Sequence, residues 1–251
     1  MGGNRAGGSA RSHAVKNLRR TLLAVLALCG VLAVATPSAG ALSVPGADGG
    51  SEQDLEGFLT SVLRDVDGYW TRVMDRNGYA EPSVGYVWIP AGRAVVDGCT
   101  GQPTDPTAAF YCPADDTIYL AETFAAAVRD GRLSRWPSGD AVDGALGDMA
   151  VAYVIAHEEA HNIQAELGLF DGSVPTRAIE LHADCLAGAW AADAARRDVV
   201  DADDLDHAQV TAWLVGDYAF DDPGHHGTPR QRVDAFMAGY DSLGSCRSYL
   251  A

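Results

Sequence analysis

Lysine is nearly absent from this chain of 251 residues: Lys16 is the only one. Acidic residues outnumber lysine and arginine by 34 to 18, which gives a formal net charge of −16 at pH 7. Nucleic acids and anionic membrane surfaces attract basic proteins. The shortage of positive charge therefore argues against nucleic acid or a membrane surface as a partner.

A hydrophobic run long enough to cross a membrane is also missing. The apolar run over residues 22–35 is shorter than the about 20 residues that a membrane-spanning helix needs. It follows a stretch with five basic residues and no acidic one, and it precedes Ala39-Gly40-Ala41. This order is typical of a secretory signal peptide. We therefore predict a signal peptide over residues 1–41; an uncleaved membrane anchor is the alternative.

The signal peptide predicts a secreted or otherwise extracytoplasmic protein whose mature form has no stable membrane span. Removing the five basic residues of the signal peptide changes the net charge from −16 to −21. Residues 42–53 contain glycine, serine and proline and are predicted to be a linker. Residues 54–251 are enough for one domain with a sizeable core, and no internal repeat divides them.

Cysteines are few. Cys29 lies in the predicted signal peptide, which leaves Cys99, Cys112, Cys185 and Cys246. No two of them form a C-x₂-C pair, so a four-cysteine zinc site is not favoured. An even number in an exported chain predicts two disulfides. Cys99 and Cys112 flank a Gly/Pro/Thr loop, which favours pairing them and leaves Cys185 for Cys246, although four cysteines permit three pairings.

The hydrophobic pattern predicts an α+β domain that is mostly helical and has a small β-sheet. Strands are expected over residues 84–89 and 117–121, with a shorter one over 108–111. Helices are expected over residues 55–74, 121–131, 142–167, 176–197, 203–218 and 229–242. Gly168 and Gly172 are expected to end the helix that begins near residue 142.

The motif H-E-x-x-H lies within that helix, at His157, Glu158 and His161. Residues four apart lie one turn apart on one helix face, so both imidazoles can point at one atom. Two neutral imidazole nitrogens suit a tetrahedral Zn²⁺, and Glu158 beside them can take a proton from water on the metal. The alternative is a pair of core histidines satisfied by hydrogen bonds, which would not explain the glutamate between them.

A catalytic zinc site needs a third protein ligand and an open fourth position. Glu180 and Asp184 lie four residues apart on the next predicted helix, on a face rich in alanine. Carboxylates buried there need a cation or a hydrogen-bond donor. We favour Glu180 as the ligand and Asp184 as the acceptor of a ligating histidine's free N–H. Asp184 as a direct ligand is the main alternative, whereas His182 lies about 200° around the helix from Glu180.

Several stretches, in this order, resemble the bacterial family described as "putative neutral zinc metallopeptidase". More distantly they resemble gluzincins of the CAAX-prenyl-protease type, which use H-E-x-x-H followed by E-x-x-x-D. The stretches are residues 110–115, 118–120, 156–161, 180–188 and 226–232. The resemblance covers roughly residues 84–247. It implies a zincin-like peptidase domain with one Zn²⁺ per chain held by His157, His161 and Glu180, and with Glu158 as the general base.

Three residues depart from the family's pattern. Glu159 and Ala160 stand where a small or aliphatic residue and a glycine are expected, and Asn162 stands where a third histidine is common. None of them is a predicted ligand. They bear on pocket shape and local charge, so the resemblance implies no substrate preference.

The predicted function is a secreted zinc metallopeptidase that hydrolyses a peptide or protein substrate. Glu158 would take a proton from the attacking water and deliver it to the leaving amine. His226 is the candidate for stabilising the oxyanion; the alternative is that His225 and His226 are simple loop residues. Arg232 is expected to pair with a buried carboxylate. Two alternatives are a metal-stabilised binding module without turnover and a zinc amidase acting on a cell-wall amide. Glu158 argues against the binding module, which needs no carboxylate that is not a ligand.

An exposed strand near the metal would offer a further way to hold an extended substrate, by pairing with it as an added strand. Residues 117–120 are the candidate for this role. The alternative is that they form a simple core strand.

Overall fold

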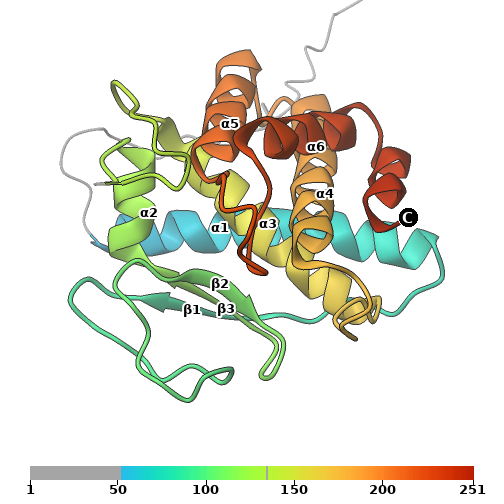
Figure 1. Cartoon of the computed structure of the whole chain (residues 1–251), viewed down its shortest axis with the longest axis horizontal. Coiled ribbons are helices and arrows are strands. Elements are labelled where there is room, and N and C mark those ends of the chain that lie inside the picture. The colour runs from blue at the N-terminus through green and yellow to red at the C-terminus, as the bar shows by residue number, and fades with distance from the viewer. Residues whose placement is uncertain (1–51, 134) are drawn as a thin grey trace, which may run out of the picture. The chain divides into compact units, whose positions relative to one another are not determined.

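The computed structural model describes residues 52–133 and 135–251, so the predicted signal peptide and most of the predicted linker lie outside the described residues. No helix in this described part is long and apolar enough to cross a membrane. Figure 1 shows a small sheet at one side of a set of helices. The helices are α1 (Glu52–Arg76), α2 (Glu122–Arg129), α3 (Gly147–Glu166), α4 (Thr176–Arg196), α5 (Ala202–Leu214), α6 (Pro229–Asp241) and the 3-10 helix η1 (Leu243–Leu250); the strands are β1 (Gly85–Ile89), β2 (Ala109–Cys112) and β3 (Thr117–Ala121).

The predicted α+β class is confirmed, and the elements differ from expectation mainly at their ends. The helix expected from residue 142 begins only at Gly147, because Gly144 and Gly147 take the left-handed backbone conformation with φ of 98° and 72°. The helix expected to run to 218 ends at Leu214. A Cβ on Gly216 would lie 2.4 Å from the Pro229 nitrogen, so the chain there passes close to the start of α6. The short helix η1 was not predicted.

The sheet is mixed, with the strand order β1-β3-β2. β3 pairs with β1 in parallel and with β2 antiparallel, so both of its edges are occupied. The predicted role of residues 117–120 as a strand that pairs with substrate is therefore wrong: they are the central strand. In the described part of the chain, β2 has an edge that pairs with no other strand.

Helix α3 lies at the centre of the molecule. All its residues from Met149 to Gln164 are buried, and α1, α2, α4, α5 and β2 pack around it. A helix that is enclosed on all sides places every side chain inside the protein. The histidines of H-E-x-x-H are thus only 6 % and 9 % exposed, which confirms that they point inward. Helix α3 ends where Gly168 takes a φ of 73°, as its sequence predicts.

Two disulfides close the fold, in the favoured pairing. Cys99–Cys112 ties a long loop to the end of β2, and Cys185–Cys246 ties α4 to η1. A site that uses all four cysteines as zinc ligands is therefore excluded in this structure. Structural disulfides are typical of oxidising compartments, which fits an extracytoplasmic location.

Helices α4 and α6 approach until their backbones touch. A Cβ on Gly188 would lie 1.9 Å from the carbonyl oxygen of Phe236, and one on Gly239 would lie 1.7 Å from that of Cys185. Side chains at either position would force the helices apart. Helix α6 begins with Thr228 as its N-cap and Pro229 in the first turn, which places Arg232 on the side facing α4.

We expect Gly239→Ala to lower the free energy of unfolding by about 3 kcal/mol, because the added methyl group would overlap the Cys185 carbonyl. The control is Gly57→Ala in the exposed part of α1, where nothing lies within 4 Å of a new Cβ. It should raise the free energy of unfolding by about 0.5–1 kcal/mol. Urea unfolding followed by circular dichroism measures both. Equal effects of the two substitutions would contradict the close helix contact.

Candidate metal centre and active site

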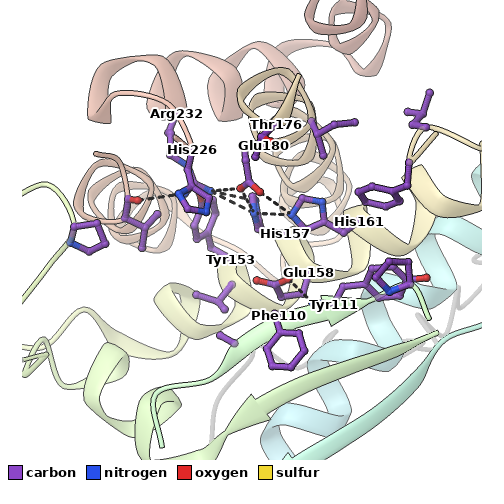
Figure 2. A pocket seen from close by; sticks show the side chains of 18 of the residues that line it. Phe110, Tyr111, Tyr153, His157, Glu158, His161, Thr176, Glu180, His226 and Arg232 are labelled. Carbon is purple, nitrogen blue, oxygen red and sulfur yellow. Dashed lines mark hydrogen bonds and ion pairs between the residues drawn. The ribbon is translucent and has the colours of Figure 1, made fainter. Parts of the chain in front are cut away.

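Two histidines of α3 and one glutamate of α4 converge on one point (Figure 2). His157 Nε2 lies 3.2 Å from His161 Nε2 and 3.2 Å from Glu180 Oε2. His161 Nε2 lies 3.6 Å from Glu180 Oε1. Among the described residues, His157, His161 and Glu180 form a group of histidine and acidic side chains whose ligand atoms lie close enough together to hold one ion.

The spacing and chemistry of these donors fit zinc. A tetrahedral zinc with bonds of about 2.0–2.1 Å separates its ligand atoms by about 3.3–3.4 Å. The three separations of 3.2, 3.2 and 3.6 Å lie around that value. Two imidazoles and one carboxylate are also a ligand set typical of catalytic zinc sites.

Gln164 determines which nitrogen of His161 carries the proton. Its amide nitrogen donates to the carbonyl oxygen of Ile179 at 2.8 Å and to His182 Nδ1 at 3.0 Å. Its amide oxygen must then face His161 Nδ1, 2.7 Å away, and that nitrogen must be the donor. The proton of neutral His161 is therefore on Nδ1, and the lone pair of Nε2 points at the cluster.

Asp184 plays the same part for His157. Its Oδ1 lies 2.9 Å from His157 Nδ1, so His157 donates from Nδ1 and keeps Nε2 for the cluster. Arg232 donates to both oxygens of Asp184 at 2.8 Å, and Tyr153 donates its hydroxyl proton at 2.5 Å. Asp184 is fully buried and lies on the far side of His157 from the convergence point. Arg232 thus pairs with a buried carboxylate, as predicted.

The charges of the cluster favour a cation. Burial raises the pKa of Glu180, but the two histidines beside it outweigh this effect and hold that pKa well below its usual range. Burial lowers the pKa of His157, but Asp184 and Glu180 raise it to about 10. Without a metal, His157 would therefore be protonated between two carboxylates. A metal ion bound at Nε2 supplies positive charge at the same place.

Glu158 points the other way, toward the sheet (Figure 2). Its Oε2 accepts a hydrogen bond of 2.9 Å from the backbone N–H of Tyr111 on β2. The Tyr111 hydroxyl donates to Asp116, and Asn162 on α3 donates to the same carboxylate oxygen. These contacts hold β2 against α3 and so fix the orientation of the Glu158 side chain.

The cluster opens into a pocket of about 570 Å³. The walls come from β2, α2, the α3–α4 loop, α4 and the segment after α5, and they are mainly apolar. Charged groups among the lining residues are confined to Glu158, Glu180 and Arg232, with His157, His161 and His226 beside them. The pocket is large enough for several residues of an extended peptide.

His226 lies at this pocket with about half of its side chain exposed. Asp217 accepts hydrogen bonds from the backbone N–H of His226 at 3.0 Å and from the His225 ring at 2.5 Å, and it also lies 3.4 Å from His226 Nδ1. Burial opposes the effect, but these bonds and one from Ala219 lower the pKa of Asp217 to about 2. Because Nδ1 of His226 faces the Asp217 carboxylate, Nε2 is the ring nitrogen that is available to a molecule in the pocket.

Two other residues discussed in the sequence analysis, His182 and Glu159, lie away from the point where the three proposed ligands converge. His182 faces Gln164, and burial together with the His161 charge lowers its pKa to about 4. Glu159 is fully buried, and neither carboxylate oxygen has a hydrogen-bond partner in the described part of the chain. Burial, with a smaller effect of Asp67, raises the pKa of Glu159 well above its usual range.

Comparison with known proteins agrees with this geometry. The model of a family described as "putative neutral zinc metallopeptidase" matches residues 22–249. The chain belongs to this family. It is 29 % identical over 216 residues to the uncharacterised protein YpfJ of Escherichia coli (strain K12), covering 76 % of this chain and 70 % of YpfJ. It is 27 % identical over 204 residues to the uncharacterised protein Rv2575 of Mycobacterium tuberculosis (strain ATCC 25618 / H37Rv), covering 70 % of this chain and 64 % of Rv2575. No solved structure matches it.

Three contributors to this family member's site were not singled out from the sequence. Gln164 lies three residues after His161, so its position on the same helix face was a usable signal. The Tyr111 N–H is a backbone group, which residue identity cannot reveal. Asp217 lies far from any motif and reaches the site only because the segment after α5 folds back onto it.

Proposed function

We propose that the protein is an exported zinc-dependent peptidase. The observation that carries the proposal is the convergence of His157, His161 and Glu180 at zinc-like spacing beside a carboxylate, Glu158, held at the same pocket. Family membership supports the same reaction class. In the proposed layout, residues 1–41 are the signal peptide, 42–53 the linker and 54–251 the peptidase domain.

His157, His161 and Glu180 would hold one zinc ion. When bound, zinc supplies positive charge that polarises a carbonyl group and lowers the pKa of water. The chain's own contribution is orientation: Gln164 and Asp184 hold the two imidazoles with their Nε2 lone pairs toward the ion. We propose that Arg232 keeps Asp184 ionised for this purpose.

Glu158 is the proposed general base. Its Oε2 is held by the Tyr111 N–H, so the carboxylate needs little rearrangement before it accepts a proton from the attacking water. The same carboxyl group would then pass the proton to the leaving amine. His226 is proposed to donate from Nε2 to the oxyanion, with Asp217 as the carboxylate on its other nitrogen.

The free edge of β2 replaces residues 117–120 as the proposed surface for an extended peptide. In an antiparallel pair, alternate residues turn their N–H and C=O groups away from the partner strand. Ala108 bonds to β3 through its carbonyl group, and the Tyr111 N–H points at Glu158. Ala109 and Tyr111 are therefore the residues of β2 whose backbone N–H and C=O groups face away from β3. Ala109 also lines the pocket. Its backbone groups would pair with a substrate strand.

The two alternative functions receive less support. A binding module without turnover would not need Glu158, a carboxylate at the pocket that is not a metal ligand. A cell-wall amidase would face a sugar-bearing substrate, whereas the pocket walls are mainly apolar. Peptide side chains suit such walls better.

The test is zinc content together with peptide hydrolysis. We expect about one zinc per purified chain by elemental analysis, and cleavage of casein that a chelator abolishes and added zinc restores. Glu180→Ala should lose both zinc and activity, because two histidines alone hold zinc weakly. Glu166→Ala, which removes an exposed carboxylate at the end of α3, is the matched control. A purified protein without zinc that also fails to take it up would overturn the proposal.

A further inference from the structure

The α3–α4 loop forms one wall of the pocket. Leu169, Phe170 and Val174 of this loop line the pocket together with Ile179 from α4. The Phe170 ring centroid lies 6.2 Å from that of His161 and 6.5 Å from that of Tyr111. This wall, which we call the Phe170 wall, is therefore next to a proposed zinc ligand and to the strand whose backbone holds Glu158.

Charge is missing from this wall. The charged residues of the same stretch, Glu166, Asp171 and Arg177, are exposed and do not line the pocket. Arg232 does line the pocket, but its Nε and Nη2 atoms donate to the two oxygens of Asp184, so its charge is already paired with a carboxylate. A charged substrate side chain placed against the Phe170 wall would lose water without gaining an opposite charge.

Phe170 itself is well exposed for a large aromatic residue. It is 43 % exposed although it lies beside buried His161. An apolar ligand that covered this ring would remove it from water, which is favourable in proportion to the area covered. The wall thus offers apolar area that no part of the described chain covers fully.

We propose that the Phe170 wall is a specificity subsite that selects a bulky apolar side chain, such as leucine, next to the bond that is cleaved. The substrate class is then peptides with an aliphatic or aromatic residue at that position. This inference rests on the proposed function, because it names the substrate of the same site.

Binding of two dipeptide hydroxamates tests the subsite without requiring turnover. The compounds differ in one side chain, leucine or glutamate, next to the zinc-binding hydroxamate. We expect the zinc-loaded protein to bind the leucine compound at least about 100-fold more tightly by calorimetry. Equal affinities, or binding of neither compound, would overturn the inference.

Substitution then assigns the preference to the wall. Phe170→Arg should weaken binding of the leucine compound about tenfold or more and strengthen binding of the glutamate compound. Tyr86→Arg is the matched control, because Tyr86 is also an aromatic residue with 43 % exposure but lies on β1 and does not line the pocket. Zinc content and thermal unfolding verify that each variant is folded and loaded. A preference that is the same in Phe170→Arg and in the unmodified protein would contradict the assignment.

The inference and the proposed function fail in different ways. Selective binding of the leucine compound by a protein that cleaves no peptide would retain the subsite and overturn the peptidase proposal. Cleavage of peptides with leucine and with glutamate at equal rates would support the peptidase proposal and overturn the subsite.

Discussion

Glu158→Gln is expected to lower kcat/KM for peptide hydrolysis by about 10³-fold while zinc stays bound. Glutamine has nearly the shape of glutamate, and its amide oxygen can still accept the hydrogen bond from the Tyr111 N–H. It cannot accept a proton from water at neutral pH. Initial rates on a fluorogenic peptide and elemental analysis of the same sample measure the two expectations together.

The adjacent Glu159 gives a matched control. It is fully buried without a hydrogen-bond partner among the described residues, and burial raises its pKa, which favours the neutral acid. Glu159→Gln replaces one neutral group by another of similar shape. We therefore expect kcat/KM within about twofold of the unmodified protein. A large loss in both variants would indicate damage to α3 rather than removal of a general base.

Arg232→Met is expected to lower the free energy of unfolding by about 3–5 kcal/mol, because it leaves the fully buried Asp184 without its cation. The hydroxyl of Tyr153 and the His157 ring would still contact Asp184, but neither carries the fixed charge of arginine. Guanidinium unfolding measures the loss. Zinc affinity should also fall, since Asp184 orients His157.

Arg230→Met on the same helix separates this effect from the general cost of losing an arginine. Arg230 pairs with Asp234 four residues later, and both side chains are exposed. Such pairs contribute little, so we expect a change below about 0.5 kcal/mol. The double variant Arg232→Met with Asp184→Asn should recover part of the stability, because no unpaired charge then remains buried. A double variant that is as unstable as the sum of the two single variants would show that charge pairing is not the cause.

The site was predictable where its chemistry is local. His157 and His161 are one helical turn apart, so their convergence needs only that α3 be a helix. The Glu180 and Asp184 pair follows the same rule within α4, and the structure brings Glu180 to the two histidines and Asp184 to the Nδ1 of His157. The disulfide pairing followed from a short loop, since Cys99 and Cys112 are close along the chain.

Prediction failed where long-range contacts decide. The strand pattern of residues 117–121 shows a strand but not its neighbours, so their central place in the sheet was hidden, and with it the free edge of β2. The start of α3 moved because Gly144 and Gly147 take the left-handed conformation, and the end of α5 moved at the point where Gly216 passes close to the backbone of Pro229. Residue patterns carry no information on such contacts.

The sequence by itself determined that this chain has two histidines and a glutamate on one helix and two further carboxylates on the next. It also determined that four cysteines follow the predicted signal peptide. Spacing of three or four residues along a helix is a local property, which is why it sufficed. Only the tertiary structure decided that Gln164 orients His161, that Arg232 neutralises Asp184, and that the Tyr111 N–H holds Glu158. Each of these contacts depends on how a side chain or strand packs on its neighbours, and packing is settled by the whole fold.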